Sequence, residues 1–280
     1  MKILVFGGDK RQIYAAEYLA ECSHDVTLAG FDNVDNLNNT VSYKSFDKAE
    51  NYDAVLLGLP SFVGDCKVNC PMSKTEYSLT DIVSRGMKCR VFCAMPSKYE
   101  KELFLEMGID YTDYYTLEKL QTLNSIPTAE GAINVFFKNS DITVFGSKCC
   151  VIGYGRIGKA LAKRLSALGA DVCVYARSER SLAEALTDKA RILTIGKDSI
   201  EASEFDCIFN TVPCVIFNKS FASKAVNTLY IELASSPGSL DKDTIELLGK
   251  NYIKAPSLPG RFAPKSAGEI IGECINALLE

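Results

Sequence analysis

A glycine-rich turn between an apolar strand and an amphipathic helix most limits how this chain can fold. The turn, Gly-Tyr-Gly-Arg-Ile-Gly at residues 153–158, follows the apolar run 149–152 and precedes a helical pattern. The apolar face of that pattern carries Ala160, Leu161, Leu165 and Leu168. A second apolar strand, 172–176, comes next, so the segment predicts a parallel strand–helix–strand unit that binds a dinucleotide at the turn.

Each glycine of the turn has its own role in this interpretation. Gly153 makes the tight turn, Gly155 lets the backbone approach a pyrophosphate, and Gly158 lets the helix pack closely against the strand. The helix N-terminus, at Arg156 and Ile157, supplies N–H donors and a partial positive charge for the phosphates. The alternative is a glycine-rich turn that binds no ligand.

The residue after the second strand distinguishes the two nicotinamide dinucleotides. Many dinucleotide-binding proteins carry Asp or Glu there, which hydrogen-bonds the ribose hydroxyls of NAD and repels a 2′-phosphate. Here that place holds Arg177, a planar cation that pairs with phosphate and stacks on adenine, and Ser178 adds a hydroxyl donor. The sequence therefore predicts NADP as the cofactor, with a solvated arginine beside an NAD site as the alternative.

Strands and helices alternate in two series along the 280 residues, which predicts an α/β fold with two doubly wound Rossmann-like domains on parallel sheets. An N-terminal flavodoxin- or Rossmann-like substrate domain is expected at 1–120, a long connecting helix or hinge at 121–140, and an NADP-binding domain at 141–263. A C-terminal helix at 264–280 is expected to join the N-terminal domain.

Three shorter segments carry expectations of their own. Pro127 is expected to break or kink the connecting helix, or to start a second helix capped by Ser125. The segment 80–88 is expected to be helical, and 61–79 a long loop.

Composition argues against several kinds of site. The net charge of −4 gives no electrostatic case for nucleic acid or an anionic membrane, and no apolar run approaches the ~20 residues that span a bilayer. The eleven cysteines, an odd number that includes several in predicted buried strands, are interpreted as reduced thiols of a cytoplasmic protein. The chain has a single histidine, His24, which gives no support for a zinc site, so no metal is predicted. One histidine at this place also argues against Ser/His/Asp hydrolysis and against a hydroxyacid dehydrogenase that uses a histidine as its acid and base.

Six segments closely resemble the A-type subunit family of dipicolinate synthase, in the same order and spacing over nearly the whole chain. They are residues 7–12, 120–133, 153–170, 209–213, 232–238 and 255–271. The combination of Asn-Ser-Ile-Pro-Thr-Ala-Glu-Gly-Ala at 124–132 with Leu-Pro-Gly-Arg-Phe-Ala-Pro-Lys-Ser-Ala-Gly at 258–268 is far more specific than the glycine turn. The segment 61–79 matches the family less clearly.

The resemblance implies an oxidoreductase acting on a CH–CH group, which oxidises dihydrodipicolinate from the lysine pathway to pyridine-2,6-dicarboxylate (dipicolinate) and transfers hydride to NADP⁺. It implies that the partner is the flavoprotein-like B-type subunit of dipicolinate synthase, and that the setting is the mother-cell cytoplasm of a sporulating bacterium. A homo-oligomer is compatible with this architecture. Another NADP-linked dehydrogenase of a small dicarboxylate and a non-catalytic NADP(H)-binding protein remain as alternatives.

The resemblance also points to side chains for the substrate. Arg11, and Lys265 with Ser266, are candidate binders of the substrate carboxylates, with ordinary surface charge as the alternative. Thr128 and Glu130 are candidates to line the site, and Glu130 is a candidate acceptor of the ring proton, with helix capping as its alternative.

Loops after the later strands are expected to complete the cofactor site, by the rule that ligands bind beyond the carboxyl ends of the strands and by family shape. Asn210, Thr211, Val212 and Pro213 are expected on the ribose and pyrophosphate side. Near the nicotinamide we expect Ala234, Ser235, Ser236, Leu258, Pro259 and Gly260.

Overall fold

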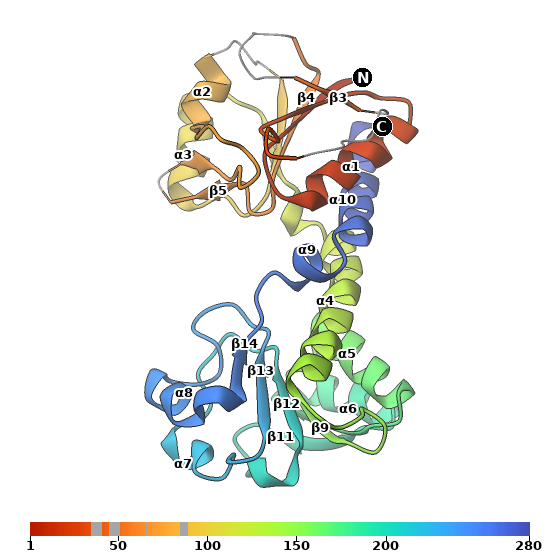
Figure 1. The fold of residues 1–280 in the computed structure, drawn as a ribbon, viewed down its shortest axis with the longest axis vertical. Coiled ribbons are helices and arrows are strands. Elements are labelled where there is room, and N and C mark those ends of the chain that lie inside the picture. Colours follow the sequence, from red (N-terminus) through yellow and green to blue (C-terminus); the bar gives the residue numbers. More distant parts are fainter. Residues whose placement is uncertain (35–40, 45–50, 65, 85–88) are drawn as a thin grey trace. The chain divides into compact units, whose positions relative to one another are not determined.

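The computed structural model describes residues 1–34, 41–44, 51–64, 66–84 and 89–280, which form two compact units. Unit 1 comprises Met1–Asn124 together with Ala263–Glu280, and unit 2 comprises Ser125–Phe262. Each unit is a parallel sheet with helices on both faces (Figure 1). The α/β fold class predicted from the sequence is therefore confirmed.

Within the described residues, the main sheet of unit 1 has six parallel strands in the order β3-β2-β1-β4-β7-β8. They are β1 (Lys2–Phe6), β2 (Asp25–Ala29), β3 (Ser42–Tyr43), β4 (Ala54–Leu57), β7 (Arg90–Cys93) and β8 (Tyr111–Asp113). The central strand β4 is buried throughout, because helices cover both faces of the sheet. Helices α1 (Lys10–Glu21) and α10 (Pro264–Leu279) pack on one face, and α2 (Leu79–Ser84) and α3 (Lys98–Glu106) on the other.

Two predicted segments of unit 1 differ in detail from the structure. The predicted loop 61–79 contains an antiparallel pair of short strands, β5 (Phe62–Val63) and β6 (Lys67–Val68). The helix predicted at 80–88 is present as α2, and residues 85–88 lie outside the described residues. A 3₁₀ helix, η1 (Tyr114–Thr116), follows β8.

The C-terminal helix α10 packs directly on α1, because two glycines allow a close approach. A side chain at Gly268 would overlap the carbonyl of Arg11, and one at Gly272 would lie 2.8 Å from the Cβ atom of Tyr18. The last helix of the chain thus belongs to the same unit as the first.

All residues of unit 2 are described, and its sheet has six parallel strands in the order β11-β10-β9-β12-β13-β14. They are β9 (Lys148–Ile152), β10 (Asp171–Ala176), β11 (Arg191–Thr194), β12 (Cys207–Asn210), β13 (Leu229–Glu232) and β14 (Tyr252–Lys254). Counted along each unit, the two main sheets share the doubly wound order 3-2-1-4-5-6. That order reverses between β9 and β12, and ligands bind beyond the carboxyl ends of the strands at such a point.

The helices of unit 2 divide between the two faces of its sheet. Helices α5 (Arg156–Ala167) and α6 (Glu179–Thr187) cover one face, and α7 (Lys219–Ala222) and α8 (Lys242–Leu248) cover the other (Figure 1). Short helical segments complete the unit: η2 (Ala202–Glu204), η3 (Gly249–Asn251) and α9 (Leu258–Phe262).

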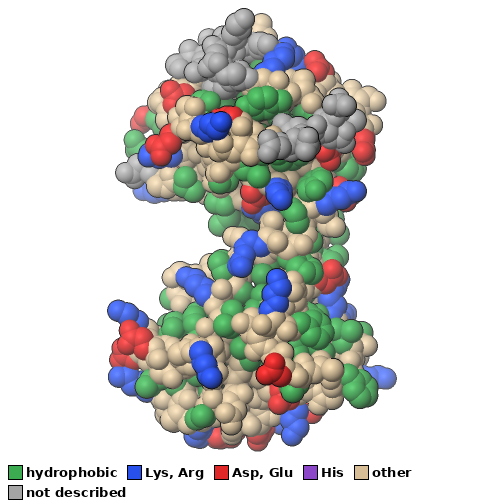
Figure 2. All heavy atoms as spheres, viewed as in Figure 1, with side chains coloured by type: hydrophobic (Ala, Val, Ile, Leu, Met, Phe, Trp, Pro, Cys, Tyr) green, Lys and Arg blue, Asp and Glu red, His purple; other side chains and the backbone are tan. Residues whose placement is uncertain are grey.

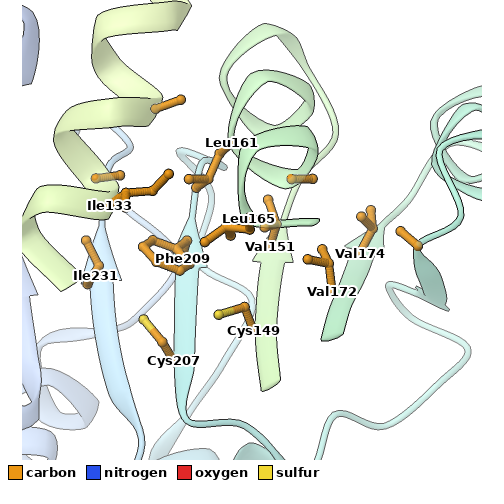
Figure 3. Close-up of a cluster of buried hydrophobic side chains, with 14 of the residues drawn as sticks. Ile133, Cys149, Val151, Leu161, Leu165, Val172, Val174, Cys207, Phe209 and Ile231 are labelled. Atoms are coloured by element: carbon orange, nitrogen blue, oxygen red, sulfur yellow. The ribbon is translucent and has the colours of Figure 1, made fainter. Parts of the chain in front are cut away.

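Cysteines fill the core of unit 2 as small apolar residues. Cys149 and Cys207 lie in one buried cluster with Ile133, Leu161 and Phe209 (Figure 3). Burial raises the pKa of the Cys149 thiol to about 11, which keeps it protonated at neutral pH. All eleven cysteines of the chain are free thiols.

Helix α4 (Glu118–Asn139) runs without interruption through Pro127, so the break and the second helix predicted there are wrong, while the kink stays a prediction. An interior proline costs about 3 kcal/mol, because it removes a hydrogen bond and crowds the preceding turn. The next turns bury Ile133 and Phe136 in the core of unit 2. Burial of two such side chains contributes about 3–6 kcal/mol, which is enough to offset the proline.

Charged side chains of both signs are interspersed over the face of unit 2 that is visible in Figure 2. In the part of the chain that the structure describes, no helix is both long enough and apolar enough to cross a membrane.

Candidate functional site

The glycine turn after β9 has an open backbone at its centre. Gly153 has a φ of +87°, in the left-handed region that favours glycine, whereas Gly155 has ordinary extended dihedrals and caps helix α5. Apart from its own chain neighbours, a side chain at Gly155 would meet no atom of the described residues within 4 Å, but one at Gly158 would overlap the carbonyl oxygen of Gly153. The turn therefore offers free space at Gly155, directly before the N-terminus of a twelve-residue helix.

Tyr154 fixes the turn from inside the unit. Its side chain is buried, and its hydroxyl donates a hydrogen bond to Asp188 Oδ2 at 2.6 Å. Lys163 lies 3.3 Å from the same carboxylate, and these two contacts hold the pKa of Asp188 below its usual range. The large side chain of Tyr154 is thus held in the protein, and the backbone at Gly155 stays uncovered.

The loop after β12 packs against the turn. A side chain at Gly153 would lie 2.5 Å from Thr211 Oγ1 and 2.7 Å from Val212 Cγ2. The Thr211 hydroxyl donates to the carbonyl of Ile152 at 2.8 Å, at the end of β9. The structure therefore brings together two segments that the sequence assigned to one site.

Asn210 is buried rather than open to a ligand. Its side chain amide donates to the carbonyl of Val212 at 2.9 Å, and its Oδ1 accepts from the N–H of Val212 at 2.9 Å. The amide therefore shapes the loop from within, and the position of Asn210 on the ribose and pyrophosphate side stays a prediction. Pro213 is exposed.

Arg177 follows the end of β10, and its side chain is exposed. It makes no hydrogen bond or ion pair with the residues that the structure describes. Ser178 is the N-cap of α6, and its hydroxyl oxygen accepts from the N–H of Ser181 at 3.0 Å. The arginine is thus free for a ligand, whereas the serine already has a structural role. Arg156 is exposed and Ile157 is half-buried at the start of α5.

Residues 258–260 begin a helix, α9, so the loop conformation predicted there is wrong, while their place near the nicotinamide stays a prediction. Leu258 is buried in the core, where it packs against Gly131 of α4, and Pro259 is also buried. The side chain of Leu258 therefore fills the core, and Gly260 is half-buried. After β13, Ala234 is half-buried, and Ser235 and Ser236 are exposed.

In unit 1, Arg11 is a buried residue rather than a surface charge. Its exposed fraction is 6%, and its Nε and Nη2 atoms each lie 2.9 Å from the carboxylate of Asp9, the N-cap of α1. Its Nη2 also donates to the carbonyl of Leu59, after β4. None of the described residues accepts a hydrogen bond from its Nη1 atom. Asp9 and Leu59 therefore hold the guanidinium at the carboxyl edge of the sheet, with one nitrogen left for a ligand.

The other substrate candidates are less constrained. Lys265 and Ser266 are exposed on α10, where Lys265 lies 3.8 Å from Glu269, and such an exposed pair is worth about 0–1 kcal/mol. In unit 2, Thr128 is buried, and Glu130 pairs with Arg164 Nε at 3.1 Å. The carboxylate expected to accept a proton is therefore already engaged by a cation.

Glu232, at the end of β13, is a polar residue that the sequence reasoning missed. It is 2% exposed, and burial raises the pKa of its carboxyl group. Its carboxylate accepts hydrogen bonds from Asn210 Nδ2 at 2.7 Å, from the N–H of Ala234 at 2.9 Å and from the N–H of Ser239 at 3.2 Å. The available signal was a carboxylate that directly follows an apolar strand. Among the described residues, no group of His, Cys, Asp and Glu is placed to hold a metal ion.

Comparisons with known proteins identify the family. Residues 2–115 match the N-terminal domain of the dipicolinate synthase A-type subunit, and residues 130–219 match the NAD-binding domain of D-isomer specific 2-hydroxyacid dehydrogenases. Over its full length the chain is 32% identical to the A-type subunit of dipicolinate synthase from Bacillus subtilis (strain 168) and covers 96% of that protein. The chain belongs to the A-type subunit family of dipicolinate synthase.

Crystal structures of two members of this family agree with the assignment. The dipicolinate synthase A-type subunit from Bacillus halodurans superposes with a TM-score of 0.89 at 29% identity, covering 99% of this chain and 97% of its own. Its counterpart from Bacillus subtilis gives 0.87 at 31% identity, covering 100% and 95%. The resemblance found in the sequence is thereby confirmed. As a member of this family with an NAD-binding domain, the chain is an oxidoreductase that uses a nicotinamide dinucleotide.

Proposed function

We propose that the chain oxidises dihydrodipicolinate to dipicolinate at a CH–CH group, with NADP⁺ as the hydride acceptor. The observation that supports NADP is Arg177, a cation directly after β10 that has no partner among the described residues, in the unit whose turn is open at Gly155. In this proposal the chain works with the flavoprotein-like B-type subunit of dipicolinate synthase in the mother-cell cytoplasm of a sporulating bacterium, as the family resemblance implies.

The cofactor residues have separate tasks. Backbone N–H groups from Gly155 to Ile157 bind the pyrophosphate, and Arg177 binds the 2′-phosphate. The loops at 211–213 and 234–236 and the residue Gly260 border the ribose and the nicotinamide. When bound, the nicotinamide supplies the hydride acceptor, and unit 2 supplies its position.

Arg11 is the proposed binder of a substrate carboxylate. Its guanidinium is held by Asp9 and Leu59, which leaves the two N–H groups of Nη1 for a carboxylate oxygen. Because its position is fixed before the ligand arrives, little conformational entropy is lost on binding. Lys265 and Ser266, on the helix packed against α1, are proposed to assist with a second carboxylate.

Formation of an aromatic ring reduces the need for a strong catalytic base, so orientation of the substrate carries more of the catalysis. Thr128 stays a proposed lining residue. The carboxylate of Glu130 already pairs with Arg164 Nε at 3.1 Å, so we propose no role for it as the proton acceptor.

Arg11→Ala is expected to raise KM for the substrate at least tenfold, while the Kd of the cofactor stays unchanged, because the two are bound by different units. Steady-state kinetics and a fluorescence titration with NADPH measure the two quantities. Arg90→Ala is the control for general damage to unit 1, since Arg90 donates to the Leu278 carbonyl at 3.1 Å and the Thr112 hydroxyl at 3.2 Å. A substrate KM that changes equally in both variants removes Arg11 from the site.

A coupled assay tests the reaction itself. The lysine-pathway precursor is generated in situ, and the protein is added with NADP⁺ or NAD⁺, with and without a candidate B-type subunit. We expect dipicolinate absorbance and NADPH to rise together, with NADP⁺ preferred. Cofactor binding without product in any combination would contradict the proposed substrate and favour another dicarboxylate or a non-catalytic role. Equal rates with NAD⁺ would contradict only the cofactor preference.

A further inference from the structure

Three adjacent strands of unit 2 end in polar side chains that lie in register. Asn210 ends β12, Glu232 ends β13 and Lys254 ends β14. Asn210 is the direct neighbour of Glu232, and Glu232 is the direct neighbour of Lys254. Register neighbours in a parallel sheet point to the same face, so these side chains form one row. The row lies at the carboxyl edge of the sheet, where ligands bind.

The Glu232 carboxylate connects the two loops that leave this edge. One oxygen accepts from Asn210, whose amide in turn holds Val212 in the loop after β12. The same oxygen accepts from the N–H of Ala234, and the other accepts from the N–H of Ser239, in the loop after β13. A single buried side chain thus sets the course of both loops.

The surrounding backbone makes room for this carboxylate. Gly238 has a φ of +78°, and a side chain there would lie only 2.7 Å from Glu232 Oε2. Lys254, the next residue in the row, is exposed. Its positive charge lowers the pKa of Glu232 and so partly offsets the effect of burial on that carboxyl group.

Burying a carboxylate does not by itself favour folding. Removal from water costs several kcal/mol, which hydrogen bonds and nearby charges recover only in part. The raised pKa of Glu232 reflects this cost, since burial is its largest cause. What the carboxylate adds is directional: it accepts from Asn210, which holds the loop after β12, and from two N–H groups of the loop after β13.

We propose that Glu232 is a positioning residue for the cofactor, which fixes the loops at 211–213 and 233–236 through its hydrogen bonds to Asn210, Ala234 and Ser239. The inference depends on the proposed placement of the nicotinamide dinucleotide against these loops. Glu232 does not touch the cofactor in this proposal and acts through the backbone of the loops.

Glu232→Gln tests this role because the new side chain has the same shape but carries an NH₂ group in place of one oxygen. That NH₂ group faces a donor in at least one of the three contacts, so the loops must move. We expect the Kd of the reduced cofactor to rise at least tenfold and KM for the oxidised cofactor to rise with it. At saturating cofactor, kcat is expected to stay within about threefold of the wild type. The free energy of unfolding is expected to change little, because a buried charge is lost together with the bonds.

Asn210→Ala tests the same connection from the other loop and is expected to raise the Kd in the same way. Thr228→Val is the matched control. It removes a buried hydrogen bond, from Thr228 Oγ1 to the Ala202 carbonyl at 2.8 Å, at the amino end of β13. This control is expected to lower the stability of unit 2 while leaving the Kd unchanged.

Fluorescence titrations of all variants use both NADPH and NADH, alongside chemical denaturation. A Kd within twofold of the wild type for both Glu232→Gln and Asn210→Ala would overturn the proposal. A loss of affinity in Thr228→Val as large as that in Glu232→Gln would overturn it too. A wild-type preference for NADH would instead contradict the proposed NADP specificity, while the ratio of variant to wild type still tests Glu232.

Discussion

Gly158→Ala is expected to abolish cofactor binding and to destabilise unit 2 by about 1–3 kcal/mol, the usual cost of overpacking a well-packed site. The added methyl group would overlap the carbonyl oxygen of Gly153. That carbonyl belongs to the backbone of the turn, so it cannot move aside as the end of a flexible side chain would. Helix α5 must shift away from β9, which misplaces the N–H groups at its N-terminus. Chemical denaturation and a fluorescence titration with NADPH measure the two effects.

Gly155→Ala is the matched control, since it adds the same methyl group three residues earlier. Apart from the chain neighbours, none of the described residues has an atom within 4 Å of the added methyl group, and the φ of −81° suits alanine. We expect at most about 1 kcal/mol of destabilisation, from the less favourable N-cap, but at least a tenfold loss of cofactor affinity. Full stability in Gly158→Ala would show that the helix adapts. Unchanged binding in Gly155→Ala would show that no phosphate approaches there.

The features that the sequence predicted correctly depend on local patterns. Buried parallel strands are read from continuous apolar runs, and the turn at 153–158 from glycines at fixed spacing between a strand and a helix. Helix α10 was predicted at 264–280 and is observed at Pro264–Leu279, because its apolar spacing and early proline are also local signals.

The features that the sequence did not predict depend on residues far apart in the chain. Arg11 is buried because the carbonyl of Leu59, 48 residues later, accepts from it. Glu130 is engaged because Arg164, 34 residues later, lies on the neighbouring helix. The role of Glu232 depends on the register of β12 against β13, which no single segment reveals. Non-local packing therefore decided which of the candidate charges stayed open to a ligand.

Unit 1 also has glycines after its first strand, Gly7 and Gly8 after β1, but the space beside them differs from that beside the turn of unit 2. In unit 1, the N–H of Gly8 donates to the carbonyl of Asn69 at 2.6 Å, and a side chain at Gly7 would overlap the sulfur of Cys70. The chain itself therefore occupies the space beside that turn. The residue of unit 1 that corresponds to Gly155 is Asp9, the N-cap of α1, whose carboxylate pairs with Arg11, whereas the N-cap Gly155 in unit 2 leaves that space open among the described residues. This difference agrees with the match of residues 130–219, in unit 2, to an NAD-binding domain.

Arg177→Asp is expected to weaken NADPH binding by about 1.5–3 kcal/mol, roughly 10- to 150-fold, which is the usual worth of a hydrogen bond to a charged group. The arginine makes no hydrogen bond or ion pair with the described residues, so its replacement removes no internal contact and should leave the fold intact. The new carboxylate would repel the 2′-phosphate of NADPH but would accept hydrogen bonds from the ribose hydroxyls of NADH. NADH binding is therefore expected to stay the same or improve.

Arg180→Asp imposes the same change of charge three residues further along, on an arginine that is 88% exposed and pairs with Glu184 on α6. If Arg177 binds the 2′-phosphate directly, only Arg177→Asp reverses the ratio of the two Kd values, and added salt diminishes the difference. If the general field of unit 2 selects the cofactor instead, both variants lose NADPH affinity to a similar extent. An equal loss of NADPH and NADH in Arg177→Asp would place the 2′-phosphate elsewhere, so parallel titrations with both cofactors decide between a direct contact and a general field.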